Sequence, residues 1–332
     1  MPSSFAAIGV AHVPYMKLLP DEEYSAVVEH ARLVLDCVPP GSVLSHVTAA
    51  QLHGIPLPAS ALLDSRTHVV RPLPATQARV PGVRGHRALH PREVTTIRGL
   101  PVTGLADTFA DLGELIGRGK PLGLDDAVVA GDACATMLES VVPLRRAIDA
   151  RVRPRGKRTL VEALQLVRVG AASPRETIAR LMFVRAGLPE PKLNEPVRSA
   201  DDPDRILGFA DLLWRVRAPD GTVQRLVGEY QGEAFHSLAD QRGRDDVRAR
   251  GFADEGWPVE EMWKADLATE AARVQTVLRF ASRLGLPRSA LTLSAVGPRF
   301  FASHVIEEAI QRSMAAEERH AERDAWDRRW GW

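Results

Sequence analysis

The stretch that decides the fold of the C-terminal half runs from Ile206 to Gln231 and reads ILGFADLLWRVRAPDGTVQRLVGEYQ. Its first part, Ile206 to Trp214, is apolar on both faces except for Asp211, which is the pattern of a buried strand. The sequence Pro219-Asp220-Gly221 supplies a turn, and Arg225 to Gln231 forms a strand that returns beside the first. This stretch predicts a β-hairpin with one carboxylate inside its apolar strand.

Asp211 needs compensation in such a strand, because an unpaired buried charge costs several kcal/mol or becomes neutral. If Pro219 to Gly221 form the loop, Glu229 falls opposite Asp211, and opposed side chains have Cβ atoms roughly 4.5 to 5.5 Å apart. Two like charges at that separation repel, whereas Mg²⁺ is typically held by one or two carboxylates. Strand alternation places Gln231 on the same face as Glu229. The hairpin therefore predicts a metal site.

The elements around the hairpin predict a complete α/β domain from residue 160 to residue 286. Ser173 to Glu176 has the form of a capping box at the start of a helix, with Pro174 at its first position. A second helix is expected from about Ser237 to Glu255, then a strand near Val259 to Trp263 and a helix to about Leu284. The order is α, β, β, α, β, α. Glu176 either joins the metal site or serves the capping box alone.

At these residues the chain resembles the PD-(D/E)XK superfamily, and within it the very-short-patch-repair-like endonuclease domains of actinobacterial proteins. The matching stretches are Ser173 to Thr177, Arg185 to Pro191, Phe209 to Leu212 and Glu229 to Gly232, followed by Asp245, Arg248 and Gly256-Trp257. The resemblance implies a restriction-endonuclease-like fold that acts on DNA. It also implies that Asp211, Glu229 and Glu176 bind Mg²⁺ or Mn²⁺, with Gln231 as the fourth catalytic residue.

Gln231 stands where that superfamily often has a lysine, and a neutral amide can orient a water but supplies no positive charge. His236 resembles the family's histidine after the glycine, one residue further along the chain. Further candidates for DNA contact are Arg242, Arg244 and Arg248. Two functions stay open: a metal-dependent DNA endonuclease, or a DNA-binding regulatory protein that keeps the fold without turnover.

The N-terminal half, residues 1–150, predicts a separate α+β domain. Helical periodicity extends from Asp21 to Cys37, and a short helix follows from Ser45 to Leu52. Residues 67–71 and 80–89 alternate as strands do, and residues 105–150 return to helical spacing.

Short motifs of this half resemble the AbiEi-type antitoxin proteins. They are Leu44 to Ala50, His53 to Pro56, and Gly99 to Thr103. The resemblance implies a third possible function, namely binding to a protein partner. The residues before Asp21 are too few for the winged helix with which such proteins begin.

Two stretches are strongly basic. Ser65 to Arg92 contains six arginines and three histidines but no acid, and it predicts a solvated surface or a phosphate-binding ribbon. Residues 151–159 crowd arginine and lysine together with Pro154 and Gly156, which predicts a solvated linker between two domains or a clamp on the DNA backbone. Residues 287–332 predict a charged helical extension.

The bulk properties limit the class of protein. A chain of 332 residues usually exceeds one hydrophobic core, so two domains are expected. The net charge of +1 argues against a protein that coats nucleic acid through global charge. Cys37 and Cys134 are too few for a disulfide framework. The sequence has no apparent signal peptide and no apolar run long enough for a membrane span. We therefore expect a cytoplasmic protein without a membrane partner.

Overall fold

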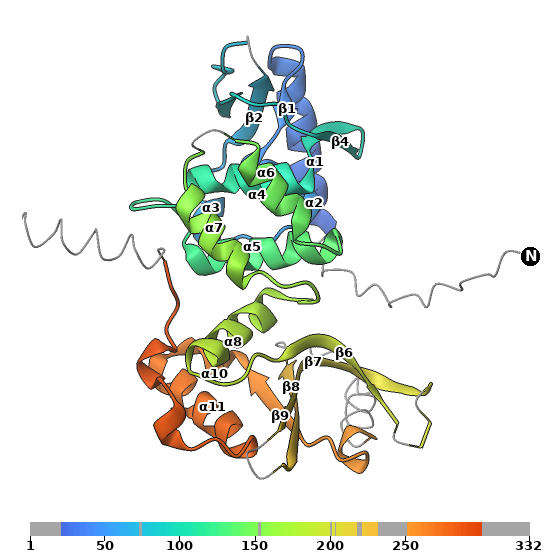
Figure 1. The fold of residues 1–332 in the computed structure, drawn as a ribbon. Coiled ribbons are helices and arrows are strands. Elements are labelled where there is room, and N and C mark those ends of the chain that lie inside the picture. The colour runs from blue at the N-terminus through green and yellow to red at the C-terminus, as the bar shows by residue number, and fades with distance from the viewer. Residues whose placement is uncertain are drawn as a thin grey trace, which may run out of the picture.

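The computed structural model describes residues 21–72, 75–151, 154–199, 201–202, 204–217, 221–231 and 251–300. Figure 1 shows two units, each with its own sheet: an N-terminal unit in blue to green and a C-terminal unit in yellow to red. Both sheets contain parallel and antiparallel pairs. The chain is thus a mixed α/β protein, which confirms the predicted fold class at that level.

The N-terminal sheet has the strand order β3-β2-β1-β5-β4. Its strands are β1 Val43–Leu44, β2 Thr67–Pro72, β3 Val83–Ala88, β4 Val94–Ile97 and β5 Leu100–Thr103. The pairs β1–β5 and β2–β3 are parallel, and β1–β2 and β4–β5 are antiparallel. Strands β2 and β3 confirm the two strands predicted in this half.

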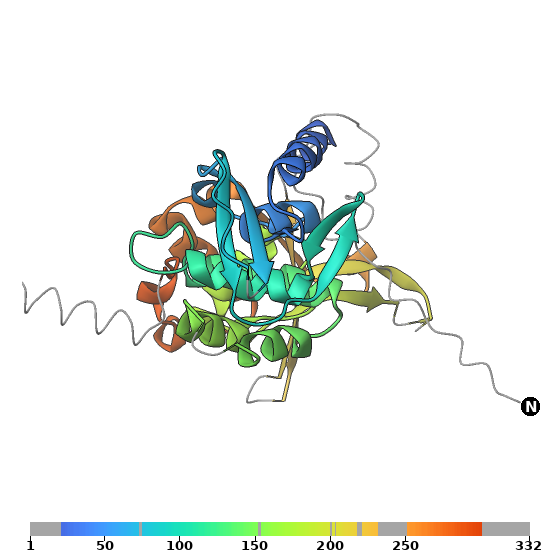
Figure 2. The ribbon, with the colours of Figure 1, turned by 90° about the horizontal axis from the view of Figure 1, so that it is seen from above.

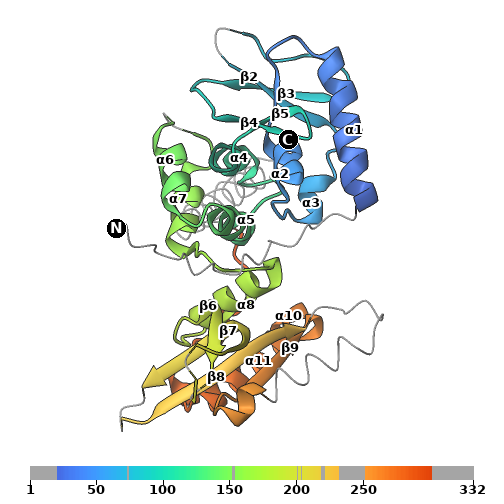
Figure 3. The ribbon, with the colours of Figure 1, turned by 90° about the vertical axis from the view of Figure 1, so that its right-hand side faces the viewer.

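Helices pack around this sheet and below it. They are α1 Asp21–Cys37, α2 His46–His53, α3 Ala59–Leu62, α4 Leu105–Leu112, α5 Leu124–Met137, α6 Val142–Asp149 and α7 Lys157–Leu166, with a 3-10 turn η1 at Gly113–Leu115. Helix α1 lies outside the strands when the unit is seen from above (Figure 2). Helices α4 to α7 are grouped between the N-terminal sheet and the C-terminal unit (Figure 3).

The predicted linker at residues 151–159 differs from the structure. Arg151 is only 5% exposed, and its guanidinium pairs with Asp107 and Asp111 at 2.9 and 2.8 Å. Gly156 has φ +67° and packs so closely on Gly113 that a Cβ atom would lie 2.3 Å from the carbonyl oxygen of Gly113. Helix α7 then contributes Leu160, Ala163 and Leu164 to the N-terminal core. The basic residues suggested a solvated linker, but the buried Asp111 and the partly buried Asp107 of α4 hold Arg151 in place.

The C-terminal sheet has the strand order β6-β7-β8-β9, in which only β8 and β9 are parallel. Its strands are β6 Lys192–Arg198, β7 Ile206–Arg217, β8 Val223–Gln231 and β9 Val259–Trp263. Leu212 pairs with Gly228 and Trp214 with Leu226, which is the register that a three-residue loop requires. The sequence did not predict the edge strand β6.

Helices α8 Pro174–Arg185, α10 Lys264–Ala268 and α11 Glu270–Arg283 pack with this sheet, and residues 251–254 are also helical. The core centres on the rings of Trp214, Phe183 and Phe280, whose centroids lie 4.6 to 5.6 Å apart. Most of the helix predicted from Ser237 to Glu255 lies outside the described residues.

Buried ion pairs join the two units where α5 meets α8. Arg180 Nη2 donates to Asp132 Oδ2 at 2.8 Å, and both side chains are at most 1% exposed. Thr177 and the backbone of Arg168 donate to the same carboxylate at 2.9 and 2.7 Å. Arg185 also pairs with Asp125 between the same two helices. A buried ion pair is favourable only when further hydrogen bonds satisfy its charged groups, and the carboxylate of Asp132 accepts three of them.

The described part of the predicted helical extension contains no α-helix. Residues 287–300 instead contain 3-10 turns at Arg288–Ala290 and Leu293–Ala295, and residues 301–332 lie outside the described chain. Within the described ranges no single helix has both the length and the apolar character to cross a membrane. Helices α5 and α6 meet these criteria only as a pair, bent by 120° at their junction.

Candidate functional site

A row of polar residues crosses the C-terminal sheet. Glu229 on β8 pairs with Glu261 on β9. Continuing the printed register by one position places Asp211 opposite Glu229, and the register of β6 with β7 places Asn194 opposite Asp211. We call these four residues the acidic row. Each strand of the sheet thus contributes one polar residue at the same level.

The strands β7 and β8 separate at the acidic row. Their ladder ends at Leu212 and Gly228, although β7 extends back to Ile206 and β8 continues to Gln231. At this point Asp211 Oδ2 accepts a hydrogen bond from the backbone N–H of Tyr230 at 2.8 Å. The side chain of Asp211 takes the place of a main-chain acceptor, and its carboxylate is thereby fixed beside β8.

Glu176 approaches the row from the first turn of α8. Its Oε2 accepts from the backbone N–H of Ala172 at 2.8 Å, and the side chain of Asn194 donates to it at 3.4 Å. Glu176 is 5% exposed. Burial and the neighbouring carboxylate of Asp211 raise its pKa to about 8. Ser173 accepts from the backbone N–H of Glu176, as an N-cap does, but the Glu176 carboxylate accepts from Ala172 instead of closing the capping box at Ser173. Its predicted role at a metal site stays a prediction.

Gln231 and Glu261 extend the site onto β9. Gln231 Nε2 donates to Glu261 Oε1 at 3.3 Å. Glu229 is buried, at 5% exposed, whereas Glu261 is exposed. The sequence analysis did not select Glu261 or Asn194. The alternation of Val259 to Trp263 could have indicated the face of Glu261, but the position of Asn194 required the unpredicted strand β6.

Carboxylate and amide oxygens are the donors that Mg²⁺ and Mn²⁺ prefer, so the donor chemistry of this site fits the predicted metal. The arrangement is open: Glu176, Asp211 and Glu229 do not form a group whose ligand oxygens all lie within 4.8 Å of one another. Waters and substrate oxygens commonly complete such sites. The candidates for DNA contact His236, Arg242, Arg244 and Arg248 lie outside the described residues.

Comparisons with known proteins find two relatives in Mycobacterium tuberculosis. They are the uncharacterized proteins MT2308 and Rv2248, each 26% identical over 249 residues, which cover 73% of this chain and 81% of the relative. No protein-family model matches the chain. No solved structure matches it either.

Proposed function

We propose that this chain is a metal-dependent DNA endonuclease whose C-terminal unit has a restriction-endonuclease-like fold. The observation that carries the proposal is the placement of Glu176 and Asp211 at the end of the β7–β8 ladder, where Asn194 and the backbone hold Glu176 and the N–H of Tyr230 holds Asp211. Burial and, second to it, the carboxylate of Asp211 raise the pKa of Glu176. Acids gathered in a partly buried place destabilise the protein unless protons or a cation neutralise them. A cation site requires several acids close together, and Asp211, Glu229 and Glu261 lie at one level of the sheet.

Asp211 and Glu229 would hold the metal, and Glu176 would assist from α8. When bound, Mg²⁺ or Mn²⁺ would neutralise charge on a phosphate and make a water more acidic. The protein fixes these carboxylates before substrate arrives: Asp211 by the N–H of Tyr230 and Glu176 by the N–H of Ala172. Gln231, hydrogen-bonded to Glu261, would orient the attacking water.

One observation favours a second function, DNA binding without cleavage. Gln231 carries no charge, and its amide is hydrogen-bonded to Glu261 rather than free to approach a phosphate. A site that lacks a cation beside the phosphate loses electrostatic stabilisation of the transition state. Under this second function the carboxylates would still bind metal, but turnover would be absent.

The test is cleavage of duplex, single-stranded and mismatched DNA by the full-length protein with Mg²⁺ or Mn²⁺. We expect nicking that a chelator abolishes, with Mn²⁺ the more permissive ion. Asp211→Ala and Glu229→Ala should each reduce cleavage by at least about 100-fold, on the scale of losing one essential charged group. Circular dichroism should show both variants folded, because removing one acid relieves repulsion in the metal-free protein.

Glu260→Gln is the matched control. Glu260 lies on β9 beside Glu261, but its carboxylate pairs with Arg279 and Arg283 of α11 at 3.3 and 2.9 Å. We expect this variant to cleave as the wild type does. Metal-independent DNA binding with no cleavage of any substrate would reject the nuclease and favour the second function.

A further inference from the structure

Three buried histidines meet in the N-terminal unit, far along the chain from the acidic row. His46 begins α2, His68 lies on β2, and His86 lies on β3; they are 1%, 0% and 8% exposed. One ring nitrogen from each lies within 4.8 Å of one from each of the others. We call these residues the histidine cluster. The cluster is notable because histidine is seldom fully buried without a specific partner.

The distances within the histidine cluster suit coordination. His86 Nε2 lies 3.2 Å from His68 Nδ1, and the rings of His46 and His86 stack with centroids 3.5 Å apart. Two nitrogens bound to one tetrahedral metal at about 2.0 to 2.1 Å lie roughly 3.3 Å apart. The spacing between His68 and His86 is already close to that value.

Two ring nitrogens of the cluster have no hydrogen-bond partner among the described residues. They are Nε2 of His46 and Nε2 of His68, both buried. His46 Nδ1 lies 3.0 Å from the hydroxyl oxygen of Ser45, so Nε2 is the nitrogen that this ring has available. A buried polar atom without a partner destabilises the protein. A metal ion would use the lone pair of His46 Nε2. His68 would coordinate through Nδ1, which lies beside His86 Nε2, and would carry its proton on Nε2.

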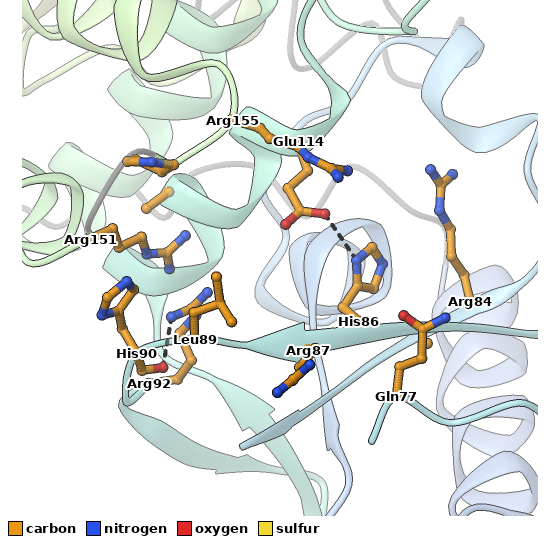
Figure 4. A pocket seen from close by; sticks show the side chains of 13 residues that line it. Gln77, Arg84, His86, Arg87, Leu89, His90, Arg92, Glu114, Arg151 and Arg155 are labelled. Atoms are coloured by element: carbon orange, nitrogen blue, oxygen red, sulfur yellow. Dashed lines mark hydrogen bonds and ion pairs between the residues drawn. The ribbon is translucent and has the colours of Figure 1, made fainter. Parts of the chain in front are cut away.

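Glu114, in the turn η1, supplies the acidic neighbour that a histidine-bound metal usually has. Its Oε2 accepts from His86 Nδ1 at 3.2 Å (Figure 4). The same oxygen lies 3.6 Å from His46 Nε2. A carboxylate on Nδ1 fixes the tautomer of His86 and leaves Nε2 for a metal.

The backbone of His46 has φ +50°, a conformation that residues other than glycine seldom adopt and that often marks a functional position.

An access route reaches the cluster from the surface. A pocket of about 390 Å³ is lined by His86 and Glu114 together with Arg84, Arg87 and Arg155. Figure 4 shows Glu114 and His86 facing each other within this pocket. A second pocket, of about 440 Å³, is lined by His68 and Arg84. Two pockets thus border residues of the cluster.

We propose that His46, His68 and His86 form a binding site for a divalent late transition-metal ion, with Zn²⁺ as the reference ion, and that Glu114 orients His86 from outside the coordination sphere. Imidazole nitrogen suits Zn²⁺, Co²⁺, Ni²⁺ and Cu²⁺, whereas the oxygen donors of the acidic row suit Mg²⁺ and Mn²⁺. The two sites therefore differ in the metal that each selects.

The experiment uses the full-length Asp211→Ala/Glu229→Ala protein, so that the acidic row does not contribute. After removal of metal with a chelator, the protein is titrated with Co²⁺ and then with Zn²⁺. We expect one equivalent of Co²⁺ with the intense visible absorption of a four- or five-coordinate ion, its displacement by Zn²⁺, and a higher melting temperature with Zn²⁺. This readout is independent of DNA cleavage, so its failure and the failure of the nuclease proposal are distinguishable.

Variants then assign the ligands. His68→Ala should lower the affinity for Zn²⁺ by at least about 100-fold, and Glu114→Gln by about 10- to 100-fold with the stoichiometry retained. The matched control is His53→Gln: His53 ends α2 near the cluster, but its Nε2 bonds to the carbonyl oxygen of Thr103 at 2.7 Å. It should bind as the parent protein does. If His68→Ala does not fold, Glu114→Gln and the Co²⁺ spectrum of the parent decide.

Three results would each overturn the proposal. The metal-free parent protein could bind less than one equivalent of Co²⁺ and Zn²⁺ at micromolar concentrations. The bound Co²⁺ could show the weak spectrum of a six-coordinate oxygen site. Or His53→Gln could weaken Zn²⁺ binding as much as Glu114→Gln does.

Discussion

The acidic row and the histidine cluster both place polar side chains on a β-sheet, but they differ in how the fold keeps them there. At the acidic row, backbone N–H groups donate to Asp211 and to the neighbouring Glu176, and burial still raises the pKa of Glu176. In the histidine cluster, burial lowers the pKa of His68 and His86. One region keeps acids where charge is costly, and the other keeps His68 and His86 in their neutral form.

This difference gives the two regions opposite responses to pH. An acid with a raised pKa in the folded state stabilises the protein at low pH and loses that contribution as the pH rises. A histidine with a lowered pKa contributes stability at high pH and loses it as the pH falls. The same chemistry underlies the proposed preference for different metals: hard oxygen donors in one region and imidazole nitrogen in the other.

The largest loss of stability is expected at the ion pair of Arg180 with Asp132, which joins the N-terminal and C-terminal units. Arg180→Ala leaves the buried carboxylate of Asp132 without its guanidinium and should lower the free energy of unfolding by about 3–5 kcal/mol. Urea denaturation followed by circular dichroism measures this loss. Arg168→Ala is the control, because its guanidinium pairs with Glu190 at the surface, where such a pair contributes about 0–1 kcal/mol. If Arg180→Ala and Arg168→Ala lowered the free energy of unfolding equally, the ion pair of Arg180 with Asp132 would contribute no more than a surface pair does.

The second-largest effect is the pH dependence of the free energy of unfolding that Glu176, beside the acidic row, is expected to cause. The pKa of Glu176 is about 8 in the folded protein and 4.5 as the reference value, so the unfolded state releases this proton first as the pH rises. Metal-free protein should therefore lose stability between pH 5 and 8, by up to about 4 kcal/mol at 1.36 kcal/mol per pKa unit. Glu176→Gln should flatten this slope in urea titrations.

Added Mg²⁺ should restore stability at pH 8 in the wild type, because metal binding favours the ionised carboxylates. The same addition should have little effect on Asp211→Ala. A slope that is unchanged in Glu176→Gln would show that another group causes it.

The two regions also differ in how far sequence could predict them. Asp211 and Glu229 lie on one hairpin, so loop length and strand alternation alone predict their register. The structure has the matching register as far as Leu212 and Gly228, one position before them. Glu176 was selected as a candidate because a capping pattern placed it in the first turn of the helix that precedes the hairpin. Glu261 was harder, because the parallel pairing of β8 with β9 spans a segment whose length does not fix the register.

The histidine cluster could not be predicted from local patterns. His68 and His86 lie in a stretch whose arginines suggested a solvated surface, yet both rings are buried. They meet because β2 and β3 pair in parallel, with Val70 beside His86, and parallel register is set by tertiary packing rather than by a short turn. His46 comes from the start of α2. The high density of arginine in this stretch predicted a solvated surface. Arg66 and Arg87 are exposed as predicted, but His68 and His86, which lie between them in the sequence, are buried.

A smaller effect is expected for acidification of the histidine cluster. The pKa of His68 is about 2 in the folded protein against 6.5 as the reference value, so below pH 6.5 the unfolded state binds the proton first. Between pH 7 and 5 the metal-free protein should lose about 2 kcal/mol from this residue. His68→Gln should remove that part of the slope, whereas His30→Gln, an exposed position on α1, should not. An identical slope in both variants would place the acid sensitivity elsewhere.

The smallest effect concerns the residue that separates the two proposed functions of the acidic row. Gln231→Lys places a cation next to Glu229 and Glu261, where it would face a bound phosphate and stabilise the charge that develops on it. Glu261 accepts from Gln231 in the wild type and would attract the new ammonium group, so part of its charge would be neutralised. We therefore expect only about a tenfold rise in the rate of Mn²⁺-dependent cleavage, equivalent to about 1.4 kcal/mol. Gln231→Met has a similar length and no charge, and it should give no increase. If lysine and methionine change the rate equally, position 231 does not act on the phosphate. If the lysine variant gains cleavage that the wild type lacks, the chain has kept the metal site of a nuclease without its turnover.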